Sequence, residues 1–453
     1  MEEIIPFIEQ SWRDMALSEG ITVTTLVVED TTLAELFKAA FSSSKIVVTA
    51  FNAQIALALV HLRSRYFVDT PFVFYLHGFA SVACWPMKKW GLLDVWREQD
   101  IFISSAKRDL ELFRLSIKTE NSFVIPFALL DEVKPDETQQ GAHDHLSLYY
   151  VGRISEQKNL HTLLWALSIY LKYSHNCSIS LDIFGSEDNL GSPNMGQKSG
   201  SYLQVLEQLS RELALTEIVK FHGFINRNLI ADKIHAGRKV LISTSLHADE
   251  NFGMAALRAL SMGHSALLSD WGGHSDYVEN FKDAVTLVDV EVSKTGPFVV
   301  VDSLVKQIEK LANSSSSNGL MDVPNHYQLE SIREKLKSVY LSNAEKKFEF
   351  SDNIEILAHR WDEFKDNPQS CRVFTSFEDV IFHQFSMAYA GRSRYYENSS
   401  MGELAIAPWV KIKNDQIVVS DPHRGERVVV LSSDLKRNRW LVENGYAFSR
   451  SSY

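Results

Sequence analysis

The feature that most constrains the fold is an alternation of short apolar runs with longer amphipathic stretches. In the first half the runs are rich in Val, Ile and Phe, and several lack polar alternation, as is typical of parallel strands covered on both faces. We expect strands at 21–28, 45–50, 71–76, 100–103 and 122–125. We expect helices at 2–17, 33–41, 53–62 and 106–115. This alternation predicts a mostly parallel sheet flanked by helices.

The second half repeats this rhythm. An amphipathic helix after the apolar run at 146–151 is predicted by leucines at helical spacing: Leu160, Leu163, Leu164, Leu167 and Leu171. We expect strands at 146–151, 178–184, 218–221, 239–244, 265–269 and 284–288. We expect further helices at 202–213 and 253–262. The chain is therefore predicted to be α/β, with two open sheets in separate domains.

Composition shifts along the chain predict the domain boundaries. Positions 131–145 are polar, with one Pro and one Gly, and are predicted to be a linker between a domain at 1–130 and a domain at 146–345. A charged helix at 346–366 is expected to return towards the first domain. Positions 367–453 are expected to form a C-terminal extension of unknown role, with a hairpin around SDPHRGE.

The composition excludes several classes of protein. With 45% apolar residues in 453, the chain can bury large cores, so global disorder is excluded. The chain has 46 Lys and Arg against 57 Asp and Glu, a net charge of −11, without a basic block, which argues against nucleic-acid partners. Three scattered cysteines and the absence of a basic leader or a long apolar run lead us to expect a cytoplasmic protein.

In open α/β sheets, ligands bind outside the carboxyl ends of the strands, so the loops that follow strands are the candidate sites. Gly152, Arg153 and Lys158 lie on one predicted strand-to-helix loop. Two cations beside a helix N-terminus suit a diphosphate. The alternative interpretation is a pair of solvated surface cations.

Three further candidates follow predicted strands. Glu250 precedes Asn251, Phe252 and Gly253, whose backbone N–H groups could bind an anion at a helix start. The DWGG run at 270–273 allows the backbone to approach a ligand closely, although it is also ordinary turn chemistry. His77 follows a strand of the first domain, although a lone histidine in such a place is more often structural.

Several motifs carry a family likeness: VGRISEQKN, LDIFGSE, VKFHGFI, LISTSLHADENFGMAALRALSMG and LLSDWGG, in this order. Together they resemble the nucleotide-sugar domain of retaining GT-B glycosyltransferases of family GT4, the glycosyl transferases group 1, over about 146–288. The first half follows more loosely, through YLHGF, FISSAKRDL and FVIPFAL. The resemblance implies two Rossmann-like domains facing a central cleft.

The resemblance also implies roles for the candidate residues. Arg153 and Lys158 match the pair that holds the donor diphosphate, and Glu250 matches the first Glu of the E-x7-E motif, close to the transferred sugar. The backbone at 251–253 would contact sugar and phosphate, and Phe224 lies in the loop beside the nucleotide base. His77 matches a histidine that reaches the donor sugar from the first domain.

The chemistry of sugar transfer fits these residues. Two cations and a helix N-terminus would stabilise the charge that develops on the departing diphosphate. We therefore expect no metal and no cofactor, with a UDP or GDP sugar as co-substrate. The acceptor is expected to be a saccharide, lipid or protein, and a partner glycosyltransferase or a second copy of the chain is a further candidate partner.

One departure from the family motif leaves an alternative function open. Where the family has a second Glu that grips the ribose hydroxyls, this chain has Arg258, which cannot accept hydrogen bonds. We expect Arg258 to be a donor-binding residue that contacts phosphate or ribose oxygens, with an acidic neighbour as the alternative partner. The family's Gly-rich opening is also missing, since no Gly precedes Gly20. The chain could therefore be a non-catalytic subunit that supports a glycosyltransferase partner. A phosphorylase or epimerase stays open too, while a dinucleotide oxidoreductase lacks its G-x-G-x-x-G motif.

Overall fold

A computed structural model gives the architecture. The residues that it describes are 4–27, 30–50, 53–78, 88, 90–130, 133, 135–136, 145–174, 178–187, 201–226, 229–247, 250–293, 296–314, 323–342, 349–352, 355, 380–390, 395–396, 404–406, 410–413, 416–421, 425–431, 436, 440–441 and 447–449. The chain divides into two compact units. Unit 1 comprises 1–133, 249–257 and 323–373, and unit 2 comprises 134–248, 258–322 and 374–453.

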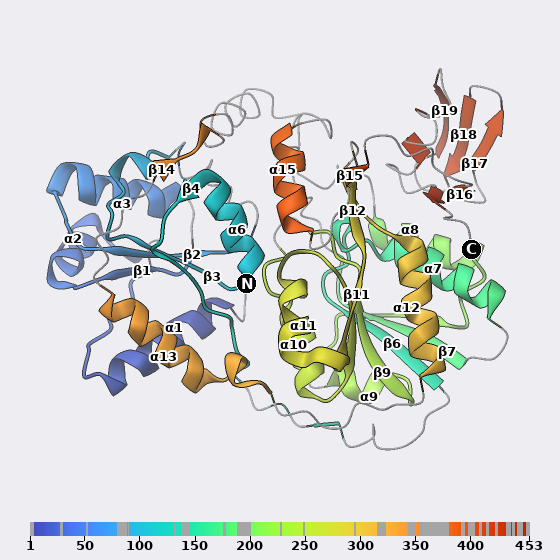
Figure 1. Ribbon diagram of the computed structural model, residues 1–453, viewed down its shortest axis with the longest axis horizontal. Helices are drawn as coiled ribbons and strands as arrows, with labels where there is room; N and C mark the ends of the chain where they lie inside the picture. Colours follow the sequence, from blue (N-terminus) through green and yellow to red (C-terminus); the bar gives the residue numbers. More distant parts are fainter. Residues whose placement is uncertain are drawn as a thin grey trace. The chain divides into compact units, whose positions relative to one another are not determined.

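Unit 1 is built on a four-stranded parallel sheet in the order β1-β2-β3-β5 (Figure 1). The two central strands, β2 and β3, are buried along their whole length, as expected when helices cover both faces. The strands are β1 (Ile46–Val48), β2 (Phe72–Leu76), β3 (Ile101–Ser104) and β5 (Ser122–Val124). The helices include α1 (Ile4–Ser18), α2 (Leu33–Ser42), α3 (Ala53–Tyr66), α6 (Lys107–Ser116) and α13 (Leu329–Leu341).

Local sequence explains where these helices begin and how they pair. Helix α2 begins with a capping box, in which the Thr32 side chain accepts from the Glu35 N–H and the Glu35 carboxylate accepts from the Thr32 N–H. Helices α1 and α13 lie side by side in Figure 1 and are joined by ion pairs of Arg333 with Asp14 and of Lys337 with Glu19. Two helices far apart in the sequence thus belong to one unit.

The strand predicted at 21–28 is wrong for the described positions 21–27, which form no strand. This run, ITVTTLV, has high strand propensity, but no neighbouring strand pairs with it, and Val27 is 53% exposed. Because a strand needs a ladder partner, propensity alone does not make one. The remaining strands expected in the first half form at their predicted places.

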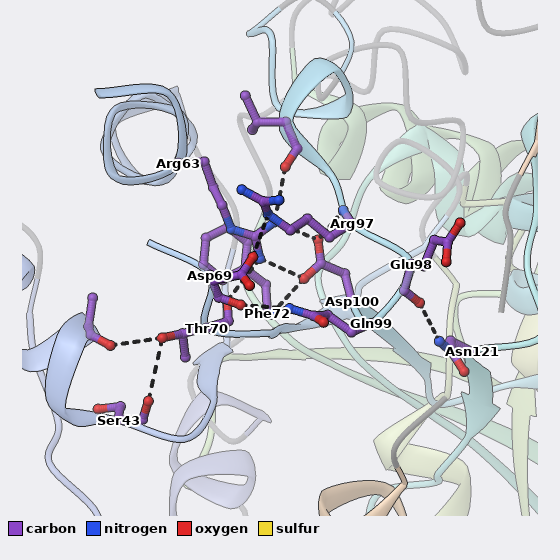
Figure 2. Close-up of polar contacts among 12 residues, drawn as sticks. Ser43, Arg63, Asp69, Thr70, Phe72, Arg97, Glu98, Gln99, Asp100 and Asn121 are labelled. Carbon is purple, nitrogen blue, oxygen red and sulfur yellow. Dashed lines mark hydrogen bonds and ion pairs between the residues drawn. The ribbon is translucent and has the colours of Figure 1, made fainter. Parts of the chain in front are cut away.

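A buried ion pair fixes the amino-terminal ends of β2 and β3 (Figure 2). The Arg63 Nη2 lies 2.8 Å from the Asp100 Oδ1, and the two side chains are 1% and 0% exposed. The carboxylate also accepts from the backbone N–H groups of Phe72, at 2.8 Å, and Arg97, at 2.9 Å. The guanidinium covers the Phe72 ring at 3.9 Å. The pair therefore joins α3 to the edge of the sheet opposite its carboxyl ends.

Unit 2 contains a six-stranded parallel sheet in the order β11-β10-β9-β6-β7-β8. Its first strand along the chain, β6, is central, with later strands added on one side and then on the other. This is the doubly wound order, whose switch point lies between β6 and β9. The strands are β6 (His145–Val151), β7 (Ser178–Phe184), β8 (Val219–Gly223), β9 (Arg238–Ser243), β10 (Ser265–Ser269) and β11 (Val285–Val288).

Helices cover both faces of this sheet. Figure 1 shows α7, α8 and α12 on one face and α10 and α11 on the other. Their bounds are α7 (Leu160–Tyr173), α8 (Tyr202–Glu212), α9 (Ile230–Lys233), α10 (Met254–Ser261), α11 (Tyr277–Phe281) and α12 (Val301–Asn313). The predicted fold class is thus confirmed, because both halves of the chain are α/β with parallel sheets.

The structure adds detail to the C-terminal part. Within 346–366, predicted as a helix, the described strand β14 (Glu349–Phe350) pairs antiparallel with β4 (Ile117–Lys118) of unit 1, and 356–366 lie outside the described residues. In the extension, α15 (Val380–Tyr389) is followed by β15 (Tyr395–Tyr396). The hairpin expected around SDPHRGE forms from β18 (Gln416–Asp421) and β19 (Gly425–Val430), with β17 (Val410–Lys413) as a third strand.

Among the described residues of the predicted linker, Asp136 is anchored to the sheet of unit 2. The Asp136 carboxylate accepts from Lys239, at 2.5 Å, and from the His264 Nε2, at 3.0 Å. The other ring nitrogen of His264 lies 2.6 Å from the Tyr149 hydroxyl. Burial lowers the pKa of His264, so the ring is neutral and donates through Nε2 while Nδ1 accepts. The Asp136 N–H also donates to the Met262 carbonyl.

Candidate functional site

The carboxyl ends of β6, β9 and β10 meet at one edge of the unit 2 sheet, because these strands are parallel neighbours. The loops that follow them are 152–159, 244–247 and 270–273. Three sequence candidates fall on these loops or next to them. The switch point between β6 and β9 lies at the same edge, which is the usual ligand site of such a sheet.

Glycines let the strand ends of β6, β7 and β8 approach each other closely. The Gly152 N–H donates to the Phe184 carbonyl at 3.0 Å, and the Gly185 N–H donates to the Gly223 carbonyl at 2.8 Å. A Cβ at Gly185 would lie 1.8 Å from the Gly152 carbonyl oxygen, and Gly185 has a φ of +145°. No other residue fits there without moving the loop that carries Arg153 and Lys158.

Lys158 is held at the switch point. It ends a short helical turn (Glu156–Lys158), and its ammonium lies 3.3 Å from the Ser245 hydroxyl, which follows β9. The Thr244 hydroxyl donates to the Lys158 carbonyl at 3.1 Å, so side chain and main chain are both joined to the β9 loop. Asn159 follows with a φ of +55° and turns the chain into α7. Arg153, on the same loop, is exposed.

A second layer of hydrogen bonds supports the β9 loop. The Ser269 hydroxyl donates to the Ser245 carbonyl at 2.6 Å and lies 3.3 Å from the His274 Nδ1. The Trp271 indole N–H donates to the His247 carbonyl at 2.9 Å. Ser245, Ser269 and Trp271 are at most 3% exposed. The edge is therefore a built network of buried polar groups.

The second group of candidates belongs to unit 1 by its contacts. Asp249–Leu257 count with that unit, so the structure does not bring Glu250 together with Lys158 in one unit. Glu250 and Asn251 are buried, and the Asn251 carbonyl accepts from the Ser105 hydroxyl at 3.4 Å. Gly253 has a φ of +79° directly before α10, as a turn into a helix requires.

Phe252 contributes to the core of unit 1. Its ring packs edge-on against Phe127, with a centroid distance of 5.2 Å, and against Tyr327, at 5.9 Å. It is 3% exposed. Its side chain therefore has a packing role, and only its backbone is available for the predicted contact with a sugar.

His77 has a defined tautomer. Its Nε2 lies 2.7 Å from the Thr49 carbonyl, which can only accept, so Nε2 carries the proton. Burial lowers the pKa of His77, against the opposing effect of that hydrogen bond, and the ring is neutral near pH 7. Its Nδ1 is buried without a hydrogen-bond partner among the described residues. It is therefore an acceptor suited to a hydroxyl donor.

Two other predicted residues differ in exposure. Phe224, directly after Gly223 at the end of β8, is 82% exposed, which is unusual for a large aromatic side chain. Arg258 is half-buried on α10 and is engaged in contacts within the protein.

One family model matches a large part of unit 2. Residues 134–317 match the model of the family described as Glycosyl transferases group 1. We call this matching segment the group 1 domain. The match begins two residues before Asp136 and includes β6 to β11, so the network at the switch point belongs to the group 1 domain.

Comparison with solved structures finds distant likenesses. Anabaena Alr3699/HepE in complex with UDP-glucose is 16% identical, with a TM-score of 0.49, and the match covers 72% of this chain and 88% of that one. A glycosyltransferase from Rickettsia africae is 14% identical, with a TM-score of 0.48, and the match covers 73% and 88%. None of the curated proteins matches the sequence.

Sequence reasoning missed the residues that organise the group 1 domain's edge. Ser245 stands in the run STSLH directly after a strand, and a hydroxyl at that place was the available signal. Trp271 lies inside the DWGG candidate, where the sequence argument uses the two glycines and not the indole side chain. The contacts of both residues depend on strand order, which the sequence does not show.

Two kinds of feature are absent from the described residues. No cluster of three or more His, Cys, Asp or Glu side chains is placed to hold a metal ion in the part of the chain that the structure describes. Within the same residues, no helix combines the length and apolar character needed to cross a bilayer.

Proposed function

We propose that the chain is a retaining, metal-independent glycosyltransferase that moves a sugar from a nucleoside diphosphate, of UDP or GDP type, to an acceptor hydroxyl. The observation that carries the proposal is the Lys158 ammonium at the β6–β9 switch point of the group 1 domain, 3.3 Å from Ser245. A diphosphate is the natural ligand of a fixed cation in that place.

Each proposed role follows from chemistry. Lys158 and Arg153 would neutralise the charge that develops on the diphosphate as the sugar–phosphate bond breaks. Glu250 would lie near the anomeric carbon, where positive charge develops. The His77 Nδ1, an acceptor, would orient a hydroxyl of the sugar. No enzyme nucleophile is needed if the acceptor hydroxyl attacks from the face that the diphosphate leaves.

The test begins with donor binding. UDP, GDP and their sugars are titrated against the purified chain, with Lys158→Ala, Arg153→Ala and Lys172→Ala as variants. A lost charge-assisted hydrogen bond is worth about 1.5–3 kcal/mol, so each of the first two variants should weaken binding roughly 10- to 100-fold. Lys172, an exposed cation near the other end of α7, is the matched control and should leave affinity unchanged.

A second measurement separates binding from chemistry. Glu250→Gln should lower kcat by at least an order of magnitude while the Kd for the nucleoside diphosphate stays within about threefold. Equal donor affinity in wild type, Lys158→Ala and Arg153→Ala would contradict the diphosphate role.

A second candidate function, a non-catalytic subunit that supports a glycosyltransferase partner, is favoured by Arg258 in place of the family's second Glu. Donor binding without turnover by the wild-type chain alone, across saccharide and lipid acceptors, would favour this candidate. Turnover that Glu250→Gln abolishes would exclude it.

A further inference from the structure

The C-terminal extension reaches the candidate donor edge of unit 2. Helix α15 ends at Tyr389, and the next residue, Ala390, forms an antiparallel bridge with Trp271 in the loop after β10. The Tyr389 ring meets the Trp271 ring edge-on, with centroids 4.9 Å apart and planes at 88°. Trp271 is 3% and Tyr389 1% exposed, so the contact is fully desolvated.

Trp271 in turn holds the loop after β9. Its indole N–H donates to the His247 carbonyl at 2.9 Å, while Ser269 holds the Ser245 carbonyl at 2.6 Å. The backbone carbonyls on both sides of Leu246, those of Ser245 and His247, are therefore held by hydrogen bonds. Since a buried indole N–H needs an acceptor and a buried carbonyl needs a donor, each group keeps the other in place.

Ser245 passes this restraint to Lys158. The Ser245 hydroxyl oxygen accepts from the Lys158 ammonium at 3.3 Å and from the His247 N–H at 3.2 Å. The same His247 residue gives its carbonyl to Trp271. A shift of Trp271 would therefore move the residue that aligns the Ser245 hydroxyl, and with it the ammonium.

The extension is itself anchored to the same unit. Strand β15 pairs parallel with β12 (Val290–Ser293), which pairs with β13 (Gly296–Val299) in a hairpin after β11. Phe385 of α15 is fully buried, and in Figure 1 the helix lies beside the strands of this hairpin. Because Phe385 is buried on one side of Tyr389 in the sequence and β15 is paired on the other, α15 can act as a rigid support.

We propose that α15 is a positioning element of the donor site, in which Tyr389 and Ala390 hold Trp271, and Trp271 aligns Lys158 through the loop at Ser245. This inference rests on the proposed function for its ligand, a nucleoside diphosphate. It gives the C-terminal extension a task that the sequence does not reveal. The competing explanation is that α15 only contributes apolar packing.

Four variants of the full chain separate the two explanations. Trp271→Phe keeps a ring but removes the N–H that reaches His247. Tyr389→Leu removes the ring contact, and Tyr389→Phe retains it. Phe385→Leu is the matched control, because it removes a buried aromatic ring from the same helix without touching Trp271 in the described contacts. Thermal unfolding of each variant reports the loss of stability.

The first readout is the Kd for UDP and GDP by calorimetry. One net hydrogen bond corresponds to roughly a three- to tenfold change, so Trp271→Phe and Tyr389→Leu should weaken binding by that factor. Tyr389→Phe should bind like the wild type. Phe385→Leu should bind like the wild type even where its Tm falls as far as that of Tyr389→Leu. The double variant with Trp271→Phe and Tyr389→Leu should cost about as much as the worse single one, since both act on one contact.

The second readout is hydrogen exchange in peptides covering 243–247, measured without nucleotide. Exchange should rise in Trp271→Phe and Tyr389→Leu and stay unchanged in Phe385→Leu. A wild-type chain that binds no nucleoside diphosphate would refute the proposed function. Nucleotide binding that Lys158→Ala weakens, but that Trp271→Phe and Tyr389→Leu leave unchanged, would refute this inference alone. An equal loss in Phe385→Leu would likewise reduce α15 to packing.

Discussion

Replacing Asp100 by asparagine tests whether the buried pair with Arg63 fixes β2 and β3. The carboxylate accepts from two Arg63 nitrogens, at 2.8 and 3.3 Å, and from the N–H groups of Phe72 and Arg97. Asparagine keeps one oxygen but turns an NH₂ group towards these donors. It also removes the counter-charge from a guanidinium on a side chain that is 1% exposed.

The expected loss is about 3–5 kcal/mol, the cost of leaving one partner of a buried ion pair behind. For a domain of about 150–250 residues, each kcal/mol lowers Tm by roughly 2–4 °C, so unit 1 should unfold about 6–20 °C earlier. The matched control is Asp69→Asn. Asp69 lies 3.1 Å from Arg97, but these side chains are 74% and 40% exposed, so its loss should cost less than about 1 kcal/mol.

The assay is urea unfolding together with hydrogen exchange of peptides covering β2 and β3, which reports on unit 1 separately from unit 2. A double replacement, Arg63→Met with Asp100→Leu, should recover part of the lost stability, because it leaves no buried charge but still removes the acceptor of the Phe72 and Arg97 N–H groups. Losses of similar size in Asp100→Asn and Asp69→Asn would refute the reasoning that burial makes the Arg63–Asp100 pair costly to break.

Three further predictions concern unit 2. Burial lowers the pKa of His264 below its ordinary 6.5, so the unfolded chain binds the proton at a higher pH than the folded chain does. The free energy of unfolding should therefore fall as pH drops below about 6.5, by up to about 1.4 kcal/mol per pH unit. Urea unfolding of wild type and His264→Gln at several pH values should show a shallower pH dependence in the variant. Gly185→Ala should lower the free energy of unfolding in urea by about 3 kcal/mol or more, because its Cβ would lie 1.8 Å from the Gly152 carbonyl oxygen. The control Gly223→Ala has φ +67° but open space around the Cβ, and it should cost about 1–2 kcal/mol. Equal costs would contradict the clash. Phe224→Ser should leave Tm unchanged, because the side chain is 82% exposed. Calorimetry should show nucleotide binding weakened by roughly 1–3 kcal/mol, the value of a lost aromatic–base stack. Unchanged affinity would show that Phe224 does not contact the base.

The elements of the fold were predictable where they depend on local signals. The runs at 146–151, 178–184 and 265–269 form strands at their predicted places, because a short stretch with apolar residues in succession or in alternation is a local strand signal. The run at 21–28 shows the limit of such reasoning. Strand propensity is local, but a ladder partner is supplied by the rest of the chain.

The candidate site was predictable only in part. Lys158 could be singled out because it follows Gly152 on a strand-to-helix loop. Its partner Ser245 is 87 positions further along the chain, and their contact depends on β6 lying beside β9. The support from Tyr389 depends on tertiary packing of the extension against Trp271. Contacts of this kind leave no periodic trace in a single sequence.

The anchoring of Asp136 matters for any attempt to isolate the group 1 domain. A fragment that begins at His145, where the sheet itself begins, would lose the carboxylate that Lys239 and His264 both contact in the interior. The Lys239 ammonium would then be buried without the Asp136 carboxylate as its counter-charge, which destabilises the fold. We expect such a fragment to aggregate during expression. A fragment that begins upstream of Lys134 keeps that carboxylate. Including or omitting the segment 134–144 therefore decides whether the domain can be studied alone.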